Sequence, residues 1–389
     1  MKILINAVSA KLGGIVTYTT NLAHSLYRRG IDFRVAVPEG LSELPNAVVF
    51  PASNYGSIRR FVWEQTLWRQ RVAGWMPDIL FSSANYSLLT SPVRQVLLVR
   101  EGGLFDPFYM RMVAPEQGVK AAFLRYLRRR LILVSGLRSD RVIVPSETLL
   151  SLVLDNNPGL AKKCRVVSYG TPIDRFTGTG RRGWRVDGVL RMLYVGVYYP
   201  HKAPADLVLA AEQLSDEGIP CRVRLTMDEK QIEETMGSRW DLAHIRRGIA
   251  KGLVETGAVR YRDLADIYAA HDLFVFPSVS ETFGHPMVEA MAAQIPIVAA
   301  ATDINREILG DCAYYYPPLK YKELVNAVRH LDAQPEERER LVVRARQRVD
   351  SKFNWEPHVD RLLAEFEDVL NPDSNSESRS MGLLVDKEA

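Results

Sequence analysis

Long apolar runs and paired cysteines are missing from this chain of 389 residues, and no secretion signal is expected. No eighteen apolar residues follow one another, so no transmembrane helix is expected. The apolar run after Met1-Lys2 is too short for the core of a signal peptide. Its three cysteines, Cys164, Cys221 and Cys312, are far apart, which is typical of reduced thiols. We therefore expect a cytoplasmic protein, or one lying peripherally on the inner face of a membrane.

Two common phosphate-binding motifs are also absent. The chain has neither the GxGxxG dinucleotide fingerprint nor the GxxxxGK[ST] phosphate loop. The missing fingerprint disfavours a dehydrogenase built on Rossmann domains. A net charge of +4 is small for this length, so the overall charge does not indicate a class of binding partner.

What is present is an alternation of short apolar strands and periodic helices, which predicts Rossmann-like α/β domains with parallel sheets. The length suits two such domains. We expect an N-terminal domain over 1–170, a linker over 171–189 rich in glycine and arginine, a second domain over 190–354, and a disordered tail over 371–389. Strands are expected at 2–8, 33–37, 78–81, 96–99, 141–144, 164–170, 191–196, 221–227, 257–259, 272–277 and 295–299, and helices at 16–29, 120–138, 205–214, 264–270, 336–348 and 355–370.

The stretch 278–292 follows one of these buried strands and carries two carboxylates. Pro286 suits the first position of a helix, which places Glu281 in the loop before it and Glu289 in about its first turn. Free amides at a helix start attract phosphate, whereas carboxylates suit hydroxyl groups. The combination indicates a nucleotide sugar. The alternative is that Glu289 only complements the helix dipole and Glu281 is a solvated loop residue, and spacing alone leaves both open.

Two other segments invite a functional interpretation. Gly13-Gly14, after the first strand, lets the backbone approach a ligand closely, although turn geometry is the commoner reason for such a pair. Residues 120–138 form a basic helix with interleaved aromatic and apolar residues. A solvated face is the usual role of such a helix, and contact with anionic lipid is the alternative. No nucleic-acid-binding motif accompanies it, so no nucleic-acid partner is expected.

With this order of elements in place, Glu281 to Glu289 resembles the E-x7-E motif of the retaining glycosyltransferases of family four. The likeness extends over about residues 3 to 370. Its other parts are Gly13-Gly14-Ile15-Val16-Thr17-Tyr18, Pro145-Ser146-Glu147, Tyr169 to Phe176, Gly196 with Lys202, Phe276-Pro277-Ser278, Glu289-Ala290-Met291-Ala292 and Phe353-Asn354-Trp355-Glu356.

This resemblance implies the GT-B fold, in which two Rossmann-like domains face each other across a cleft and the helix at 355–370 crosses back to the first. It implies that Glu281 binds hydroxyls of the donor sugar and Glu289 those of the ribose. Lys202 is then the point charge on the leaving diphosphate, and Glu281 and Lys202 are the catalytic candidates. The remaining donor-binding candidates are Gly13, Gly14, Gly196, Phe283, Gly284 and His285.

Two positions depart from the family pattern. Val197 stands where an arginine is usual, and Arg100-Glu101 replaces a His-Asp pair at the acceptor side. Arg100 and Glu101 are therefore acceptor candidates, with a surface ion pair as the alternative. The folded region has no Asp-x-Asp, so no obligatory metal and no cofactor is expected.

The sequence thus predicts a retaining glycosyltransferase that moves a hexose from a nucleotide sugar to a carbohydrate or lipid-linked acceptor, in the biosynthesis of a polysaccharide, lipopolysaccharide or other glycoconjugate. The alternative is a catalytically silent protein that binds nucleotide sugars or a membrane surface, the latter through residues 120–138.

Overall fold

The computed structural model describes residues 1–11, 13–177 and 183–372. Its N-terminal part is built on a seven-stranded parallel sheet in the order β3-β2-β1-β4-β5-β6-β7. Most of these strands are short, apolar and buried, as in a parallel sheet covered on both faces. They are β1 (Lys2–Asn6), β2 (Asp32–Val37), β3 (Ala47–Val49), β4 (Ile79–Ser82), β5 (Arg94–Leu98), β6 (Arg141–Val144) and β7 (Cys164–Val166).

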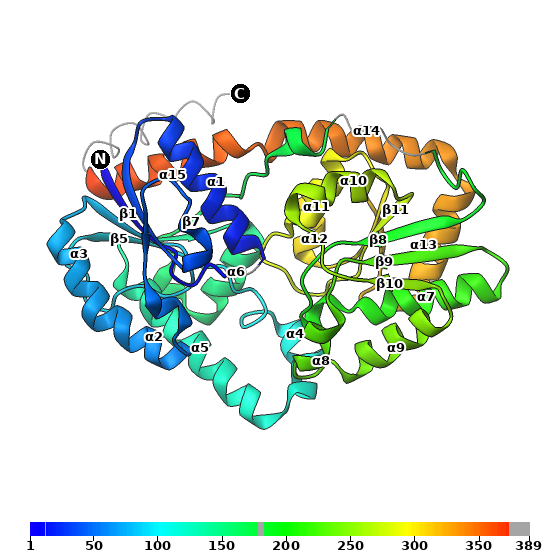
Figure 1. Ribbon diagram of the computed structural model, residues 1–389, viewed down its shortest axis with the longest axis horizontal. Helices are drawn as coiled ribbons and strands as arrows, with labels where there is room; N and C mark the ends of the chain where they lie inside the picture. The colour runs from blue at the N-terminus through cyan, green and yellow to red at the C-terminus, as the bar shows by residue number, and fades with distance from the viewer. Residues whose placement is uncertain (12, 178–182, 373–389) are drawn as a thin grey trace.

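A second parallel sheet follows, with six strands in the order β10-β9-β8-β11-β12-β13. Figure 1 shows the two sheets in two lobes that lie side by side. In both sheets the order reverses beside the first strand, and ligands bind at such a switch point, beyond the carboxyl ends of the strands. The strands are β8 (Leu190–Tyr194), β9 (Cys221–Leu225), β10 (Val254–Thr256), β11 (Leu273–Phe276), β12 (Ile297–Ala300) and β13 (Tyr314–Tyr316).

Helices cover the faces of both sheets. The first lobe carries α1 (Gly14–Arg28), α2 (Ser57–Trp63), α3 (Arg69–Trp75), α4 (Pro107–Met112), α5 (Gly118–Arg138) and α6 (Glu147–Asn156). The second carries α7 (Pro204–Asp216), α8 (Glu229–Glu234), α9 (Arg239–Ala250), α10 (Leu264–Ala269), α11 (His285–Ala292), α12 (Asp303–Leu309), α13 (Tyr321–Ala333) and α14 (Pro335–Lys352). Within the described residues, no helix is long and apolar enough to cross a bilayer.

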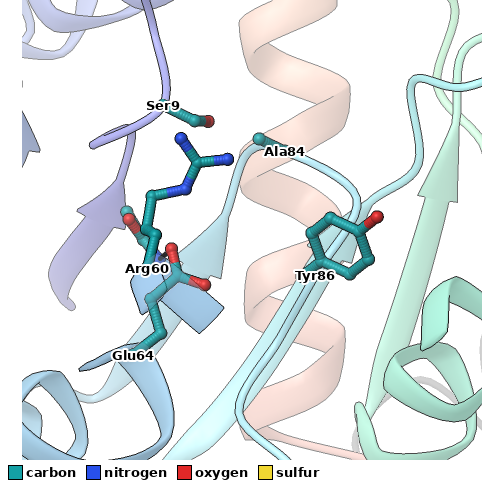
Figure 2. A pocket seen from close by; sticks show the side chains of 6 residues that line it. Ser9, Arg60, Glu64, Ala84 and Tyr86 are labelled. Atoms are coloured by element: carbon teal, nitrogen blue, oxygen red, sulfur yellow. Dashed lines mark hydrogen bonds between the residues drawn. The ribbon is translucent and has the colours of Figure 1, made fainter. Parts of the chain in front are cut away.

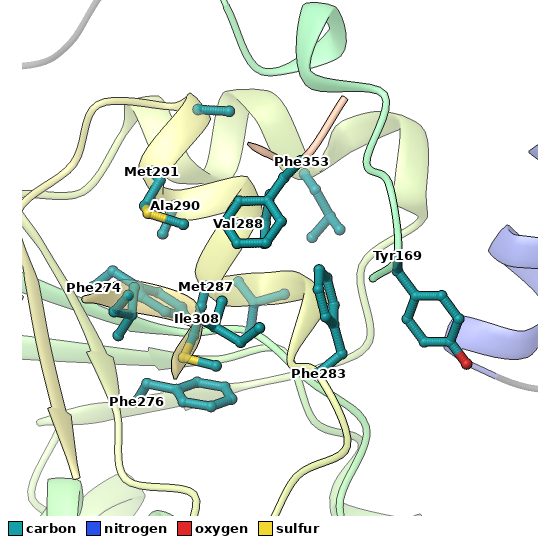
Figure 3. Packing of buried hydrophobic residues seen from close by; sticks show 14 of the residues in the cluster. Tyr169, Phe274, Phe276, Phe283, Met287, Val288, Ala290, Met291, Ile308 and Phe353 are labelled. Carbon is teal, nitrogen blue, oxygen red and sulfur yellow. The ribbon is translucent and has the colours of Figure 1, made fainter. Parts of the chain in front are cut away.

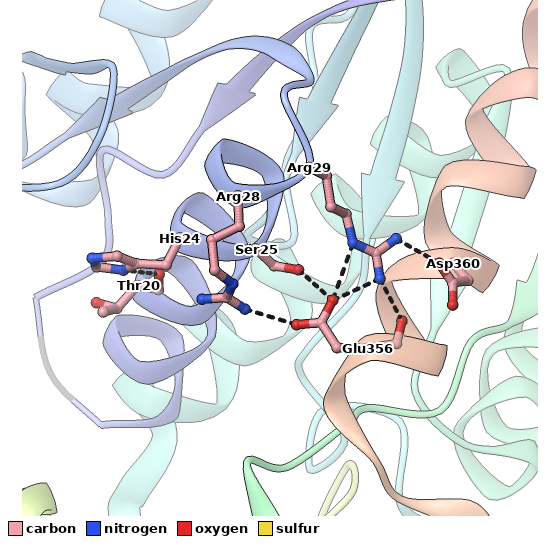
Figure 4. A network of polar contacts seen from close by, with 7 residues as sticks. All are labelled: Thr20, His24, Ser25, Arg28, Arg29, Glu356 and Asp360. Carbon is pink, nitrogen blue, oxygen red and sulfur yellow. Dashed lines mark hydrogen bonds and ion pairs between the residues drawn. The ribbon is translucent and has the colours of Figure 1, made fainter.

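The last helix, α15 (Trp355–Leu370), returns to the first lobe (Figure 1). Its first turn is held on α1 by a charged network shown in Figure 4. Arg28 donates to Glu356 at 2.8 Å, Arg29 donates to the same carboxylate at 2.6 Å, and the Ser25 hydroxyl donates to it at 2.8 Å. Single exposed ion pairs contribute little, but several that converge on one carboxylate fix the place where a helix docks.

The junction of β11 and α11 is tightly packed. All four residues of β11 are buried, and Figure 3 shows Phe276 beside Met287, and Phe283 between Phe353 and Tyr169. Gly284 caps α11 with φ +83°, and a Cβ there would come within 2.5 Å of the Met287 side chain. The left-handed backbone favours glycine there, and the flexible end of Met287 would have to shift to admit a larger residue.

Some expected elements need correction. The predicted strand 257–259 is wrong, because β10 lies three residues earlier and buries Val254, whereas Gly257 leaves the sheet with φ +140°. The helix predicted to begin at Pro286 begins one residue before it. Within the predicted linker, Thr171 bridges to Asn354, while residues 178–182 lie outside the described part of the chain. Residues 373–389 of the predicted tail also lie outside it.

Candidate active site

The loop between β11 and α11 places Glu281 at the inner edge of the second lobe. The Ser278 hydroxyl donates to Glu281 Oε1 at 2.6 Å. Asn305, from α12, donates to the Ser278 carbonyl at 3.1 Å and to the Ala300 carbonyl at 2.9 Å. A neighbouring helix thus holds the loop, and Glu281 is not the solvated residue of the alternative interpretation.

Lys202 reaches Glu281 from the turn that follows β8. Its ammonium forms a charge-assisted hydrogen bond with Glu281 Oε1, and both side chains are about one-tenth exposed. Burial alone would raise the pKa of Glu281, but the positive charge of Lys202, with its hydrogen bond and that of Ser278, lowers it below the ordinary value. The two predicted catalytic residues therefore meet as an ion pair.

His201 links the two loops. Its carbonyl accepts a hydrogen bond of 2.9 Å from the Val279 amide. Burial, followed by the adjacent charge of Lys202, lowers the pKa of the imidazole to about 4. His201 is therefore neutral near pH 7, and Lys202 supplies the positive charge at this point.

Glu289, the fifth residue of α11, lies in a different environment. It is only 3% exposed, and the Tyr268 hydroxyl donates to its Oε2 at 3.1 Å. Burial raises the pKa of Glu289 to about 7, although hydrogen bonds from Tyr268 and Tyr261 oppose the rise. The Glu289 carboxyl group therefore keeps its proton to higher pH than an exposed glutamate does. The two carboxylates of the motif thus differ in charge because only Glu281 has a cationic partner.

The start of α11 offers backbone donors at the same edge. Within the described residues, the amides of Gly284 and His285 donate no hydrogen bond. The Phe283 side chain is buried against Tyr169, with ring centroids 5.3 Å apart. Unpaired amides at a helix start attract an anion. Gly196 differs, because its amide already donates to the Thr226 hydroxyl at 3.0 Å.

Gly13 and Gly14 face this edge from the first lobe. A Cβ on Gly13 would lie 3.7 Å from the Val197 side chain, and one on Gly14 would lie 3.6 Å from His285 and 3.7 Å from Arg100. The glycine pair therefore opposes both the loop after β8 and the start of α11. Gly13 has φ +69°, so backbone strain also favours glycine there.

Arg100 and Glu101 are neighbours in sequence but lie in different environments. Arg100 lies over the rings of Tyr18 and Tyr169, at 5.1 and 5.3 Å from their centroids. Glu101 instead accepts a hydrogen bond of 2.5 Å from Arg128 on α5. Arg100 thus borders the face between the lobes, whereas Glu101 pairs with Arg128 and not with Arg100.

Gly102 lies close against the second lobe. A Cβ on it would stand 2.7 Å from the Glu281 carbonyl oxygen, which is closer than a real contact allows. Farther along, the Ser146 hydroxyl donates to the Thr282 carbonyl at 2.9 Å. The loop that carries Glu281 is therefore packed directly against the first lobe.

Family models match both halves of the chain. The model described as Glycosyltransferase Family 4 matches residues 12–175, and the model described as Glycosyl transferases group 1 matches residues 185–348. The chain belongs to glycosyltransferase family four.

Curated relatives agree with this family. The chain is 28% identical over 244 residues to D-inositol 3-phosphate glycosyltransferase of Geodermatophilus obscurus, covering 59% of this chain and 52% of that protein. It is 27% identical over 259 residues to the Mycobacterium tuberculosis protein of the same description, covering 64% and 52%. The family-four chain thus spans about half the length of the curated relatives it matches.

Solved structures show the same fold. Sucrose-phosphate synthase from Thermosynechococcus elongatus superposes with a TM-score of 0.75 at 19% identity, covering 96% of this chain and all of that one. Anabaena Alr3699/HepE in complex with UDP-glucose gives 0.73 at 18% identity, covering 95% and all of that chain. The predicted GT-B fold, with two Rossmann-like units, is confirmed.

Sequence reasoning missed several residues of this family-four site. Ser278 donates to Glu281, and Asn305 holds the Ser278 carbonyl. Tyr268 and Tyr261 donate to Glu289. Ser278 belongs to the Phe276-Pro277-Ser278 motif, so the sequence could have indicated it, whereas the two tyrosines and Asn305 belong to no motif. Within the described residues, no group of three or more His, Cys, Asp or Glu side chains could hold a metal ion.

Proposed function

We propose that this protein is a retaining glycosyltransferase that moves a hexose from a nucleotide sugar to a carbohydrate or lipid-linked acceptor, in polysaccharide, lipopolysaccharide or other glycoconjugate biosynthesis. One observation carries the proposal: Lys202, Glu281 and the start of α11 meet Gly14 and Gly102 of the other lobe. A cation, free amides and a carboxylate at one edge match the diphosphate and the hydroxyls of such a donor.

In the proposed reaction, the bond between the anomeric carbon and the diphosphate oxygen breaks, and the diphosphate keeps the electron pair. Lys202 and the amides of α11 stabilise this developing charge. The acceptor hydroxyl attacks the same face of the oxocarbenium-like sugar, and its proton passes to the leaving diphosphate. Glu281, held by Ser278, orients the sugar hydroxyls once Lys202 turns to the phosphates. In this proposal no divalent metal is required, because the chain has no Asp-x-Asp within its folded region.

Donor binding is the first property to test. HepE was solved with UDP-glucose, so uridine nucleotides head a thermal-shift screen that also includes ADP, GDP and their glucose conjugates. A ligand at one hundred times its Kd adds about 2.7 kcal/mol to the free energy of unfolding. We expect one nucleoside family to raise Tm markedly, its sugar conjugate included.

Transfer is then measured with the radiolabelled form of that donor and oligosaccharide or lipid-linked acceptors. We expect product with the anomeric configuration of the donor, formed at the same rate in EDTA. If no donor gave either transfer or hydrolysis, the proposal would be contradicted. Nucleotide-sugar binding without turnover would instead favour the silent binding protein.

An exposed apolar stripe on α5 supports contact with a membrane surface, where a lipid-linked acceptor would reside. Val119, Phe123, Tyr126 and Leu127 are 87, 65, 49 and 40% exposed. Their spacing places them on one face of the helix. A contiguous exposed apolar face is unusual on a soluble surface and marks a contact site.

The basic component of α5 is smaller than the sequence indicates. Arg125 is buried and donates to the Ala114 carbonyl at 3.0 Å, and Arg128 is paired with Glu101. Lys120 and Arg130 remain exposed beside the stripe, with Arg129 half-buried. We propose that these cations and the stripe contact anionic lipid headgroups.

Replacing Val119 and Phe123 together with serine should lower sedimentation with anionic vesicles at least ~10-fold, because each apolar side chain contributes about 1.5–3 kcal/mol when buried. The matched control is Val343→Ser, which changes an exposed valine on α14. Equal binding of the native protein to neutral and anionic vesicles would refute the electrostatic part, and an unaffected double variant would refute the role of the stripe.

A further inference from the structure

Glu64 and Asp241 are buried carboxyl groups that have no part in the proposed reaction. Figure 2 shows Glu64 beside Arg60, at a hollow in the first lobe. The cavity volume is about 10 Å³, which is room for about one water molecule. Asp241 instead bonds to the segment of the second lobe that carries Lys202, so it is placed to affect sugar transfer.

Asp241 lies in the first turn of α9 and is only 6% exposed. Its Oδ2 accepts a hydrogen bond of 2.7 Å from the Tyr198 hydroxyl, and its Oδ1 accepts one of 3.1 Å from the Ala205 amide. Tyr198 precedes Lys202 in the chain, and Ala205 follows it. One carboxyl group therefore holds both ends of the segment 198–205, in which Lys202 lies.

The two donors also favour the charged form of Asp241. Burial raises the pKa of Asp241 to about 6, and the hydrogen bonds from Tyr198 and Ala205 oppose the rise. Hydrogen bonds to a carboxylate are stronger than those to a neutral group. The contacts of Asp241 are therefore of a kind that can hold a segment of chain in one place.

The segment between these hydrogen bonds has an unfavourable backbone. Pro200–Lys202 form a short 3₁₀ turn, and Ala203 follows it with φ +44°. For a residue with a Cβ this left-handed conformation is costly, so it persists only where the surrounding contacts impose it. The hydrogen bond from Ala205 to Asp241 fixes the chain two residues after Ala203.

The first lobe supports the same turn from another side. Ala203 lies in an apolar cluster with Tyr109 of α4, and the Tyr109 ring meets the His201 ring edge-on with centroids 5.8 Å apart. These contacts require the two lobes to be docked. Both partners of Asp241 belong to the second lobe, so its hydrogen bonds hold the turn without any contribution from the first.

We propose that Asp241 is a positioning residue for Lys202, because it fixes the turn from which the Lys202 ammonium reaches Glu281 and, in the proposed reaction, the leaving diphosphate. The inference rests on the proposed function, since it concerns the same reaction. Asp241 acts through the backbone of the turn and exchanges no proton with the substrate. A cation held in place beforehand stabilises the leaving group without the cost of ordering the turn during the reaction.

The first test follows the position of Lys202 without using activity. Lysines of the full chain are acetylated with a trace of acetic anhydride, and mass spectrometry gives the rate at Lys202 relative to Lys163, whose ammonium donates to two backbone carbonyls at 2.7 Å. Tyr198→Phe and Asp241→Ala should each raise this ratio about tenfold, because the turn opens more often without its charged hydrogen bonds. The matched control is Tyr315→Phe, which removes a tyrosine hydroxyl that donates to a backbone carbonyl at 2.6 Å elsewhere in the second lobe and should leave the ratio unchanged.

The second test asks whether Asp241 acts through Lys202. Asp241→Ala should lower kcat ~10²-fold and change the donor KM less than about threefold, as misplacement of a group that acts only in the transition state does. Asp241→Asn keeps one oxygen acceptor and should recover part of the rate. In a Lys202→Ala background, Asp241→Ala should have no further effect, because the effects of residues that act together are not additive.

Melting curves accompany every variant, and the milder Tyr198→Phe keeps the test informative if Asp241→Ala unfolds. A raised ratio at Lys202 supports the positioning role even if no donor is turned over, which would count only against the proposed function. The role is overturned if folded variants keep the native ratio, if acetylation rises equally at Lys202 and Lys163, or if Asp241→Ala lowers turnover as much in the Lys202→Ala background as in the native one.

Discussion

Replacing Lys202 with alanine is expected to lower the turnover of sugar transfer by ~10²–10³-fold, as the loss of one preorganised donor does at other sites of developing negative charge. Lys202 is the cation that the structure places at the edge of the second lobe beside Glu281, and neighbouring His201 is neutral because burial lowers its pKa to about 4. Burial, the largest cause of that low pKa, persists in the variant. Release of nucleoside diphosphate under saturating donor measures the effect.

Two comparisons separate the role of this charge from a loss of structure. Lys202→Arg keeps the positive charge and should recover part of the rate. Lys322→Ala removes an exposed lysine on α13 and should leave it unchanged. Melting curves are needed, because breaking a buried ion pair costs about 3–5 kcal/mol. A folded Lys202→Ala protein with native turnover would exclude the proposed role.

Replacing Glu289 with glutamine should weaken donor binding and reduce its dependence on pH. In the donor-free protein the pKa of Glu289 is about 7, so the carboxylate that would accept from ribose hydroxyls becomes more populated as pH rises. Native affinity should therefore be about tenfold higher at pH 8 than at pH 6, which reflects the ionised fraction. Calorimetric titration of donor at several pH values measures both effects.

Comparison with the variant is essential, because Glu64 and Asp206 also have pKa values raised to about 7 by burial. Only the part of the pH dependence that disappears in Glu289→Gln belongs to Glu289. The exposed Glu336→Gln on α14 is the control. Unchanged donor affinity in Glu289→Gln would contradict the ribose role.

Glu289 should also make the free energy of unfolding depend on pH. Its folded-state pKa is raised above the unfolded value, so its contribution to the free energy of unfolding is complete below about pH 4.5 and is lost as pH rises through about 7. The loss amounts to about 3 kcal/mol at most. Denaturant titrations of the native protein and Glu289→Gln should show this difference in slope between pH 4.5 and 7.

Several elements could be predicted from local pattern alone. β11 is apolar and ends at Phe276, just before Pro277, and α11 begins beside Pro286, because burial and proline geometry act over a few residues. The strand predicted at 257–259 lies three residues earlier, as β10. Val254 and Val259 are both apolar and flank the turn at Gly257, and only the pairing of β10 with β9 shows that Val254 belongs to the strand. Helices α9 and α13 were not predicted, although both contain apolar residues that become buried.

For the candidate site, motif order predicted the residues but not the contacts between them. Motif order identified Glu281, Glu289, Lys202 and the glycine pair before any distance was known. It did not reveal that Lys202 pairs with Glu281, or that Tyr268 holds Glu289.

By itself the sequence determined the alternation of strands and helices, the two parallel sheets that follow from it, and the family, because periodicity, glycine and proline act locally and motif order survives in the chain. Tertiary structure alone decided which groups meet and how they are charged. Gly102 touches the Glu281 backbone only because the two lobes dock, and Glu289 keeps a raised pKa only because α10 and α11 bury it. Contact and burial depend on three-dimensional packing, and this packing gives two carboxylates of one motif opposite pKa shifts.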